Sequence, residues 1–219
     1  MLRFAPFRTL LPLALALPLL GGCVPALLVT GATGTVISYH DRRSTGTQID
    51  DETTEWRARN RVPGQYRDGG NINFTSFNRT LLISGEVGDE SAKLEIGEIA
   101  RQIDGVGRVH NELQIGPPSS RQSRSNDVLI SSKYKTRLLD SDGVSSNHIK
   151  PVTENGVLFV MGVVNEREAK AAIDVARTTS GVRKVVNLLE IVPAEETRRL
   201  DNAHFGSREP GALPPASAR

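Results

Sequence analysis

The side chains that most often carry chemistry in proteins are sparse and widely spaced in this sequence. The four histidines stand at positions 40, 110, 148 and 204, and no HxxxH or HExxH spacing occurs. The serines form no G-x-S-x-G elbow, and Gly31-Ala32-Thr33-Gly34 lacks the Gly-Lys-Ser/Thr ending of a phosphate-binding loop. We therefore expect a protein that is not an enzyme and that holds no metal and no cofactor.

One acidic run, Asp50-Asp51-Glu52, could suggest a metal site. It opens the segment Asp51–Arg61, whose residues follow a helical pattern. Carboxylates at the start of a helix interact favourably with the helix dipole. We therefore favour helix capping over metal binding for these three acids.

The only cysteine, Cys23, leaves no partner for a disulfide, a CxxC redox pair or a Cys-based zinc site. It follows Leu20-Gly21-Gly22, an aliphatic residue and two small residues, and this run resembles a bacterial lipobox. A lipid donor must reach the sulfur, and the small residues let extended backbone enter the peptidase. We expect Cys23 to become the lipidated, palmitate-bearing N-terminus; the alternative is an ordinary signal peptide followed by an unrelated cysteine.

The residues before Cys23 have the pattern of a signal peptide. Arg3 and Arg8 form a basic start, and the apolar stretch from Leu10 to Leu20 follows. As a helix this stretch would reach only about 16 Å, roughly half of a bilayer's hydrocarbon core. We expect residues 1–22 to be removed. By resemblance to enterobacterial sorting rules, Val24 in place of Asp favours the outer membrane, with the body in the periplasm.

Composition limits what the rest of the chain can be. The 219 residues are 38% hydrophobic and 24% charged, which is typical of folded protein, but only 5% are aromatic, which favours small cores. Without Arg3 and Arg8, the 27 basic residues become 25 and balance the 25 acidic ones. The chain therefore lacks the basic footprint of a nucleic-acid-binding protein.

Two segments of the chain resemble one another, Ile72 to Ile115 and Ile149 to Ile191. The spacing is 77 residues in the first half, where Leu81, Gly85, Val87, Ala92 and Lys93 meet Leu158, Gly162, Val164, Ala169 and Lys170. After a one-residue gap it is 76 residues, and Ala100, Arg101, Gly105, Val106, Val109, Asn111, Leu113 and Ile115 meet Ala176, Arg177, Gly181, Val182, Val185, Asn187, Leu189 and Ile191. This agreement indicates an internal duplication.

Each copy has the pattern of two strands, a helix and a last strand, with a further helix in front. The strands are expected at 72–77 with 80–87 and at 149–153 with 157–164, and alternating apolar residues mark the last strand of each copy. The leading helices are expected at 51–61 and 127–139. Gly105 and Gly181 stand where a helix end needs positive φ. The sequence therefore predicts an α+β protein with two tandem αββαβ domains.

The expected organisation divides the chain into six parts. They are a signal peptide over 1–22, a lipidated tether over 23–46, the first domain over 47–116, a linker over 117–123, the second domain over 124–193 and a disordered tail over 194–219. Within the tether, the segment from Val24 to Ser38 is apolar, and it either lies against the membrane or is merely low in charge. Because the linker is short, we expect the two domains to pack against one another.

The lipobox and the repeated pattern G-V-x-x-V-x-N-x-L resemble the BON-domain family of periplasmic and membrane-associated bacterial proteins. Asp41-Arg42-Arg43-Ser44-Thr45 is similar to the lead-in of the outer-membrane lipoproteins that carry two such domains, and Glu166-Arg167-Glu168-Ala169-Lys170 to part of their second domain. The resemblance covers roughly residues 36–193. It implies a non-enzymatic role, in which the first helix of the second domain contacts anionic phospholipid and the protein supports envelope integrity.

The charges agree with a membrane role for the second domain. Residues 47–116 hold 8 basic and 12 acidic groups, whereas residues 124–192 hold 10 basic and 8 acidic groups. In the helix expected at 127–139, Ile130, Tyr134 and Leu138 form a core stripe, capped by Ser125 or Asp127. The residues turned away from that stripe combine an apolar tip with cations, as a membrane-surface helix requires. The expected lipid contacts are Val128, Leu129, Lys133, Lys135 and Arg137.

Three classes of function stay open. The first is a lipid-anchored protein that binds an anionic phospholipid membrane and has a possible envelope protein partner. The second is a periplasmic interaction module that holds an envelope or outer-membrane assembly partner, in which case the basic helix face is simply solvated. A hydrolase with an unrecognised site is the least favoured.

Overall fold

The computed structural model describes residues 41–205, which lie in one compact unit of the chain. In chain order the first domain contains α2 (Thr45–Arg61), α3 (Gly64–Gly69), β1 (Asn71–Phe77), β2 (Thr80–Val87), α4 (Glu90–Arg101), β3 (Arg108–Asn111) and β4 (Gln114–Ile115). The second contains α5 (Arg121–Leu139), the 3-10 turn η2 (Ser146–His148), β5 (Ile149–Glu154), β6 (Val157–Val164), α6 (Glu166–Arg177) and β7 (Lys184–Ile191), and α7 (Ala194–Phe205) follows it. The expected α+β fold with two αββαβ units is confirmed.

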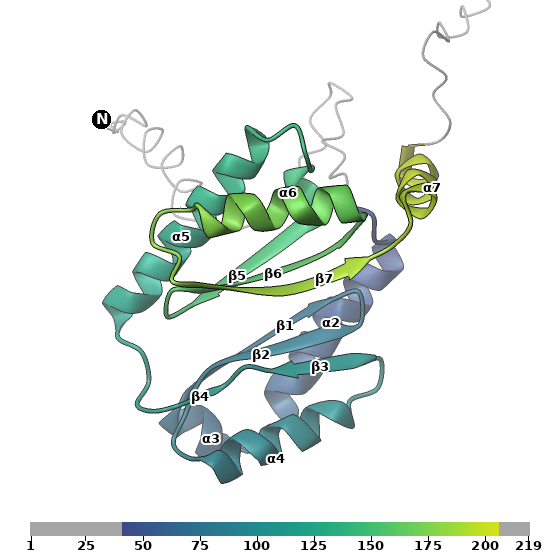
Figure 1. Ribbon diagram of the computed structural model, residues 1–219. Coiled ribbons are helices and arrows are strands. Elements are labelled where there is room, and N and C mark those ends of the chain that lie inside the picture. Colours follow the sequence, from purple (N-terminus) through teal and green to yellow (C-terminus); the bar gives the residue numbers. More distant parts are fainter. Residues whose placement is uncertain (1–40, 206–219) are drawn as a thin grey trace, which may run out of the picture. The chain divides into compact units, whose positions relative to one another are not determined.

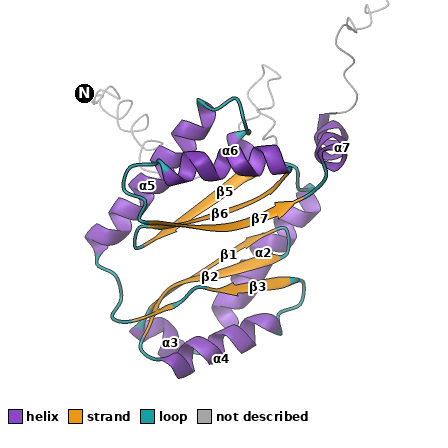
Figure 2. Ribbon diagram, viewed as in Figure 1, coloured by secondary structure: helices purple, strands orange, loops and turns teal. Residues whose placement is uncertain are grey.

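The two sheets have the same topology (Figure 2). In each, the first two strands pair antiparallel and the last strand pairs parallel with the middle one, giving the orders β1-β2-β3 and β5-β6-β7. The first domain differs in two details. It has the extra helix α3, and its last strand is split, with Glu112 and Leu113 separating β3 from β4.

Each domain uses a buried aspartate of its first helix to hold the turn of its first hairpin. Asp51 accepts hydrogen bonds from the backbone N–H groups of Asn78 (2.8 Å) and Arg79 (3.1 Å). Asp127, 76 residues later, accepts from those of Asn155 and Gly156 at 2.8 Å each. All four turn residues have positive φ, the geometry of a tight two-residue hairpin turn. Asp51 is therefore not the helix-dipole acid that the sequence predicted; it lies inside α2 because that helix begins earlier.

Both leading helices begin earlier than expected. Ser44 caps α2 by accepting from Thr47 N, and Ser120 caps α5 by accepting from Ser123 N. The expected cap at Ser125 or Asp127 was therefore wrong, and residues 121–123 are helix rather than linker. The positive φ predicted for Gly105 and Gly181 is confirmed. At Gly181 a side chain would also meet Ile130 of α5, since a Cβ there would lie 2.9 Å from its Cγ1.

Both faces of each sheet are covered (Figure 1). One face of each sheet packs against its own helices, and the residues of these two cores alternate along the strands with residues pointing the other way. The second faces of the two sheets meet each other and form a third apolar cluster. Its buried members are Phe77, Leu82, Phe159, Met161 and Val163. We call this contact between the sheets the interdomain seam.

Polar contacts surround the interdomain seam. The Lys150 ammonium donates to Glu55 Oε1 (2.9 Å) and Ser76 O (3.1 Å), and Asn78 Nδ2 donates to Glu190 Oε2 (2.7 Å). The expectation that the two domains pack against one another is therefore confirmed, by an apolar centre with polar edges.

The segment before α2 and the helix after β7 belong to this body. Arg42 is buried and donates to both oxygens of Glu168, to both oxygens of Asp201 in α7, and to Val163 O. Its neighbour Arg43 donates to Asp41 and Asp51 and lies 3.9 Å from the centre of the Phe77 ring. Residues 41–46 are thus not tether, and residues 194–205 are helix rather than disordered tail; 206–219 lie outside the described residues.

Candidate functional site

Helix α5 is fixed in rotation by its buried stripe. Ile130, Tyr134 and Leu138 are at most 7% exposed, as the spacing of four predicted. The Tyr134 hydroxyl donates to Ala172 O of α6 at 3.1 Å, and burial raises its pKa well above the ordinary value. Because these contacts allow one orientation, the opposite side of α5 is turned to solvent.

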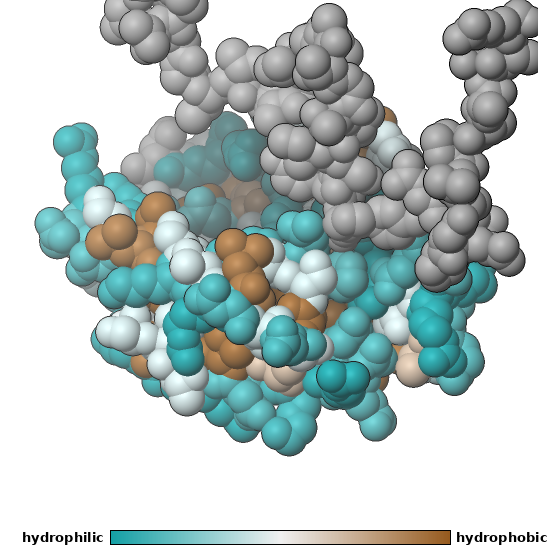
Figure 3. Space-filling model, turned by 90° about the horizontal axis from the view of Figure 1, so that it is seen from above, coloured by the Kyte–Doolittle hydropathy of each residue, from teal (hydrophilic) through white to brown (hydrophobic). Residues whose placement is uncertain are grey.

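The solvent side of α5 carries three large apolar residues. Val128 is 65% exposed, Leu129 56% and Leu139 73%. Leu139 was missed by sequence reasoning because it is the last residue of the helix, outside the 129–133–137 line. Figure 3 shows apolar groups scattered among hydrophilic ones on the face of the molecule that is seen from above.

The hydroxyl residues between these apolar side chains are satisfied within the helix. Ser132 Oγ donates to Val128 O at 2.9 Å, and Thr136 Oγ1 donates to Ser132 O at 3.0 Å. A hydroxyl that already donates to its own helix loses little when water is removed. This side of α5 can therefore be desolvated at low cost.

Two exposed cations lie beside the apolar residues and bond to no other described residue. Lys133, as the sequence predicted, is one turn beyond Leu129. Arg121 is the other, two turns before Val128 and on the same side of the helix. Sequence reasoning missed it because the helix was expected to begin at 127. We call the following set the α5 outer face: Arg121, Val128, Leu129, Ser132, Lys133, Thr136 and Leu139.

Two of the five predicted lipid contacts have other partners. The Lys135 ammonium donates to Ser146 O (2.5 Å) and Ile149 O (2.8 Å), and burial lowers the pKa of this group. Arg137 donates to Val175 O and to the hydroxyls of Thr178 and Thr179 at the end of α6. Lys135 therefore ties α5 to η2 and β5 and does not belong to the outer face, while Arg137 joins α5 to α6.

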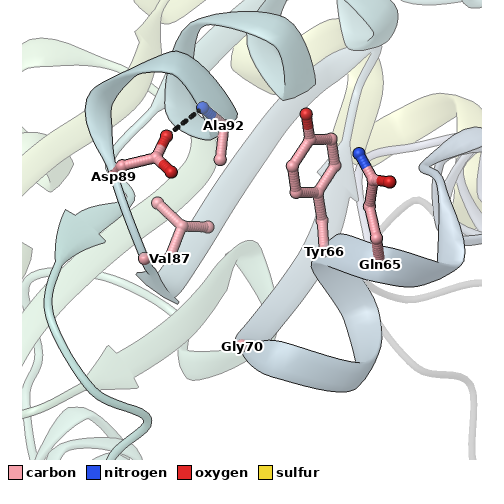
Figure 4. Close-up of a pocket in the computed structure, with 7 residues that line it drawn as sticks. Gln65, Tyr66, Gly70, Val87, Asp89 and Ala92 are labelled. Atoms are coloured by element: carbon pink, nitrogen blue, oxygen red, sulfur yellow. Dashed lines mark hydrogen bonds between the residues drawn. The ribbon is translucent and has the colours of Figure 1, made fainter.

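A separate hollow of about 320 Å³ lies in the first domain, between α3 and the start of α4 (Figure 4). Its polar groups are already in use. Asp89 caps α4 by accepting from Ala92 N at 2.8 Å, and the Tyr66 hydroxyl donates to Glu95 Oε2 at 2.5 Å. This hydrogen bond raises the pKa of Tyr66. A phenol held in this way is a poor general base.

The structure describes the surroundings of two histidines, His110 and His148. Burial lowers the pKa values of both His110 and His148, so both rings are neutral at neutral pH. His148 lies 3.7 Å from Asp201, which is one of the two carboxylates that bind Arg42. Within residues 41–205 no group of His, Cys, Asp and Glu side chains could hold a metal ion, and no helix is long and apolar enough to cross a membrane. His40 and Cys23 lie outside this range.

Comparison with known proteins agrees with this architecture. The BON domain model matches residues 50–117 and again 126–193. The chain belongs to the BON-domain family. The outer membrane lipoprotein DolP of Haemophilus influenzae is 34% identical over 191 residues, which are 86% of this chain and 98% of that protein. This likeness supports a DolP-type protein with two BON domains.

Two further relatives contain parts of the same sequence pattern. The 21 kDa hemolysin of Actinobacillus pleuropneumoniae is 32% identical over 69% of this chain and 79% of its own length. The osmotically-inducible protein Y of Escherichia coli is 27% identical over 54% of this chain and 61% of its own length. In this chain the two BON domains pair through their sheets, which leaves the helices of both domains outside.

Proposed function

We propose that this BON-domain protein is a non-enzymatic lipoprotein of the outer membrane, anchored at the periplasmic face through Cys23. Its second BON domain binds anionic phospholipid through the α5 outer face and thereby supports envelope integrity. The observation that carries the proposal is the composition of that face, with three exposed apolar side chains, two free cations and hydroxyls that need no water.

The strength of such a contact suits a protein that is already anchored. Each half-exposed apolar side chain contributes roughly 1 kcal/mol on burial. Each cation near an anionic surface contributes about 1 kcal/mol. The sum is modest for a free protein, but an anchor converts binding into an intramolecular step with a high effective concentration.

The entry of the chain into the body favours α5 as the membrane side. Asp41, the first described residue, lines the same hollow as Lys135 of α5. Seventeen residues separate it from Cys23, a reach of at most about 60 Å when extended. The anchored chain therefore joins the body beside the helix proposed to contact lipid.

Flotation with vesicles tests this proposal, using the chain from residue 24 onward so that no acyl chain is present. The fragment should retain Arg42 and α7, because both belong to the folded body. Leu129→Asp with Lys133→Glu should abolish flotation with vesicles rich in anionic phospholipid. The matched control is Ile49→Asp with Arg59→Glu on α2, which changes one exposed apolar residue and one exposed cation outside α5. Equal loss in both variants, or flotation of the α5 variant, would contradict the proposal.

Lipidation at Cys23 has its own test. Cys23→Ala should prevent incorporation of labelled palmitate and leave a precursor or a species without the anchor. Palmitate incorporation that persists in the variant would show that the anchor lies elsewhere.

One observation favours the second candidate, an interaction module that holds an envelope partner. Trp56 (63% exposed) and Ile49 (58% exposed) lie two turns apart on one side of α2. A photo-crosslinking residue at position 56 in cells should capture a protein if this candidate holds. If no protein is captured at this position, α5 stays the proposed functional surface, whereas crosslinks from position 56 to lipid would place α2 at the membrane and count against the proposal.

A further inference from the structure

Two buried carboxylates, one from each domain, lie together at one end of the interdomain seam. Glu86 of β2 is 4% exposed and Glu154 of β5 is 7% exposed. Both belong to the strand residues that point toward the opposite domain. Buried acids of this kind are normally paired with a cation.

One amide group bridges the two carboxylates. Asn71 Nδ2 lies 3.1 Å from Glu86 Oε2 and 3.0 Å from Glu154 Oε1. The two oxygens are therefore within about 6 Å of each other, close enough for strong repulsion between two negative charges in a buried site. Asn73 Nδ2 supplies a further hydrogen bond to Glu154 Oε2 at 3.0 Å, and Ser119 N supplies one to Glu86 Oε2 at 3.0 Å.

No cation compensates this pair among the described residues. Around it, Arg124 of α5 donates to Ser119 O at 2.8 Å, and Arg183, beyond α6, donates to Asn155 O. Besides Glu86, a second acid lies near Glu154, namely Asp127 of α5. The two oxygens of Asp127 accept from the backbone N–H groups of Asn155 and Gly156. Glu86 Oε1 is buried and has no hydrogen-bond partner.

We propose that Glu154 holds a proton beside the buried Glu86 carboxylate, so that the docked pair of BON domains is more stable in mild acid than in mild alkali. This property is independent of lipid binding. A proton on Glu154 removes the repulsion between the two carboxylates.

The direction of the pH effect follows from linkage. Burial, reinforced by the Glu86 charge, raises the pKa of Glu154 above its ordinary value. The folded protein then binds more protons than the unfolded chain between the two pKa values. Stability from this pair is fully present below the ordinary glutamate pKa and is lost as the pH rises through the folded value. Glu168, held below its usual pKa by Arg42, acts in the opposite sense, so a difference between variants is needed.

The Glu86→Gln variant isolates the pair. Its amide oxygen can accept from Asn71 and Ser119, while the amide nitrogen takes the place of the unpartnered Oε1. Urea unfolding of the chain from residue 24 onward, from pH 4.5 to 8, measures the folding equilibrium constant with and without Glu86→Gln. This constant should be higher in the variant, and the difference should grow with pH. Glu52→Gln, an exposed acid on α2, is the matched control and should show no such trend.

Carboxyl NMR titration of the unmodified chain gives a second measurement that does not depend on the variant folding. Glu154 should titrate at clearly higher pH than the ordinary glutamate value. A stability difference that stays constant with pH, or titration of Glu154 at the ordinary glutamate value, would overturn the proposal.

Discussion

Helices α2 and α5 occupy equivalent places in the two domains, yet their solvent sides differ. Inside, Asp51 and Asp127 hold the hairpin turns in the same way. Outside, the residues 76 positions apart diverge: Glu52, Thr53 and Trp56 in α2 stand where α5 has Val128, Leu129 and Ser132. The duplication thus retains the contacts that build the fold and varies the surface. Function therefore has to be sought in the positions where the copies disagree.

The two domains also differ in how the lead-in holds them. Arg42 binds the second domain and α7, whereas Arg43 binds Asp51 and the Phe77 ring of the first. The two neighbouring arginines therefore bind different domains, and together they connect the lead-in to both.

The largest effect is expected from removing Arg42. Arg42→Met leaves Glu168, which is mostly buried, without its cation, and breaking a buried ion pair typically costs about 3–5 kcal/mol. The partly exposed Asp201 should lose less. Urea unfolding followed by circular dichroism measures the loss. Arg43→Met is the matched variant for the first domain, and an equal or larger loss there would show that the lead-in holds both domains alike.

A smaller loss is expected from the turn-holding aspartates. Asp51→Ala removes an acceptor used by Arg43, Ser76 and two backbone N–H groups, which should cost about 3 kcal/mol. Asp127→Ala leaves only the N–H groups of Asn155 and Gly156 without their acceptor and should cost about 2 kcal/mol. Thermal unfolding of the two variants gives the ranking. A reversed order would mean that the second hairpin depends more on its turn than the first.

Transferring the α2 surface to α5 should separate binding from stability. Val128→Glu with Leu129→Thr places the residues of α2 at the equivalent positions of α5. Vesicle flotation should be lost, while the free energy of unfolding should change by no more than about 0.5 kcal/mol, since both side chains are exposed. Retained flotation would show that the difference between the two helices is unrelated to lipid.

The smallest effect is expected from the reverse transfer at one position. Ser132→Trp gives α5 the aromatic residue that α2 has at Trp56, in the centre of the α5 outer face. A Trp ring is suited to the membrane interface and should tighten vesicle binding several-fold. Titration with vesicles of increasing anionic content measures this gain, and unchanged binding would indicate that this face does not contact the bilayer.

Much of the fold could be predicted because the duplication shows the same strands twice. The two hairpins, the helix between strands and the positive φ at Gly105 and Gly181 all follow from local patterns. The early start of α5 was missed because Asp127 looked like a cap, whereas Ser120 has that role two turns earlier. Residue type alone could not decide between Asp127 and Ser120 as the cap, because Asp127 accepts hydrogen bonds from the hairpin turn instead.

The candidate site was predicted in part, and the reasons are physical. Val128, Leu129 and Lys133 could be found from helical spacing alone, because their exposure depends only on the buried stripe. Lys135 and Arg137 have partners 11 to 42 residues away, and Arg42 has partners more than 120 residues away. Such contacts leave no periodic signal in the sequence, so only the folded chain reveals them.

Arg42 also determines how the body carries mechanical load. A pull on the chain from the side of residue 41 meets the Arg42 guanidinium and its two carboxylates before it reaches the first turn of α2. These bonds connect the segment before α2 to α6 and α7, so the force is transmitted to the second domain and does not act on the first turn of α2 alone. A chain tethered through Cys23, as proposed above, would therefore pass a pull from its anchor into the second domain as well as into α2.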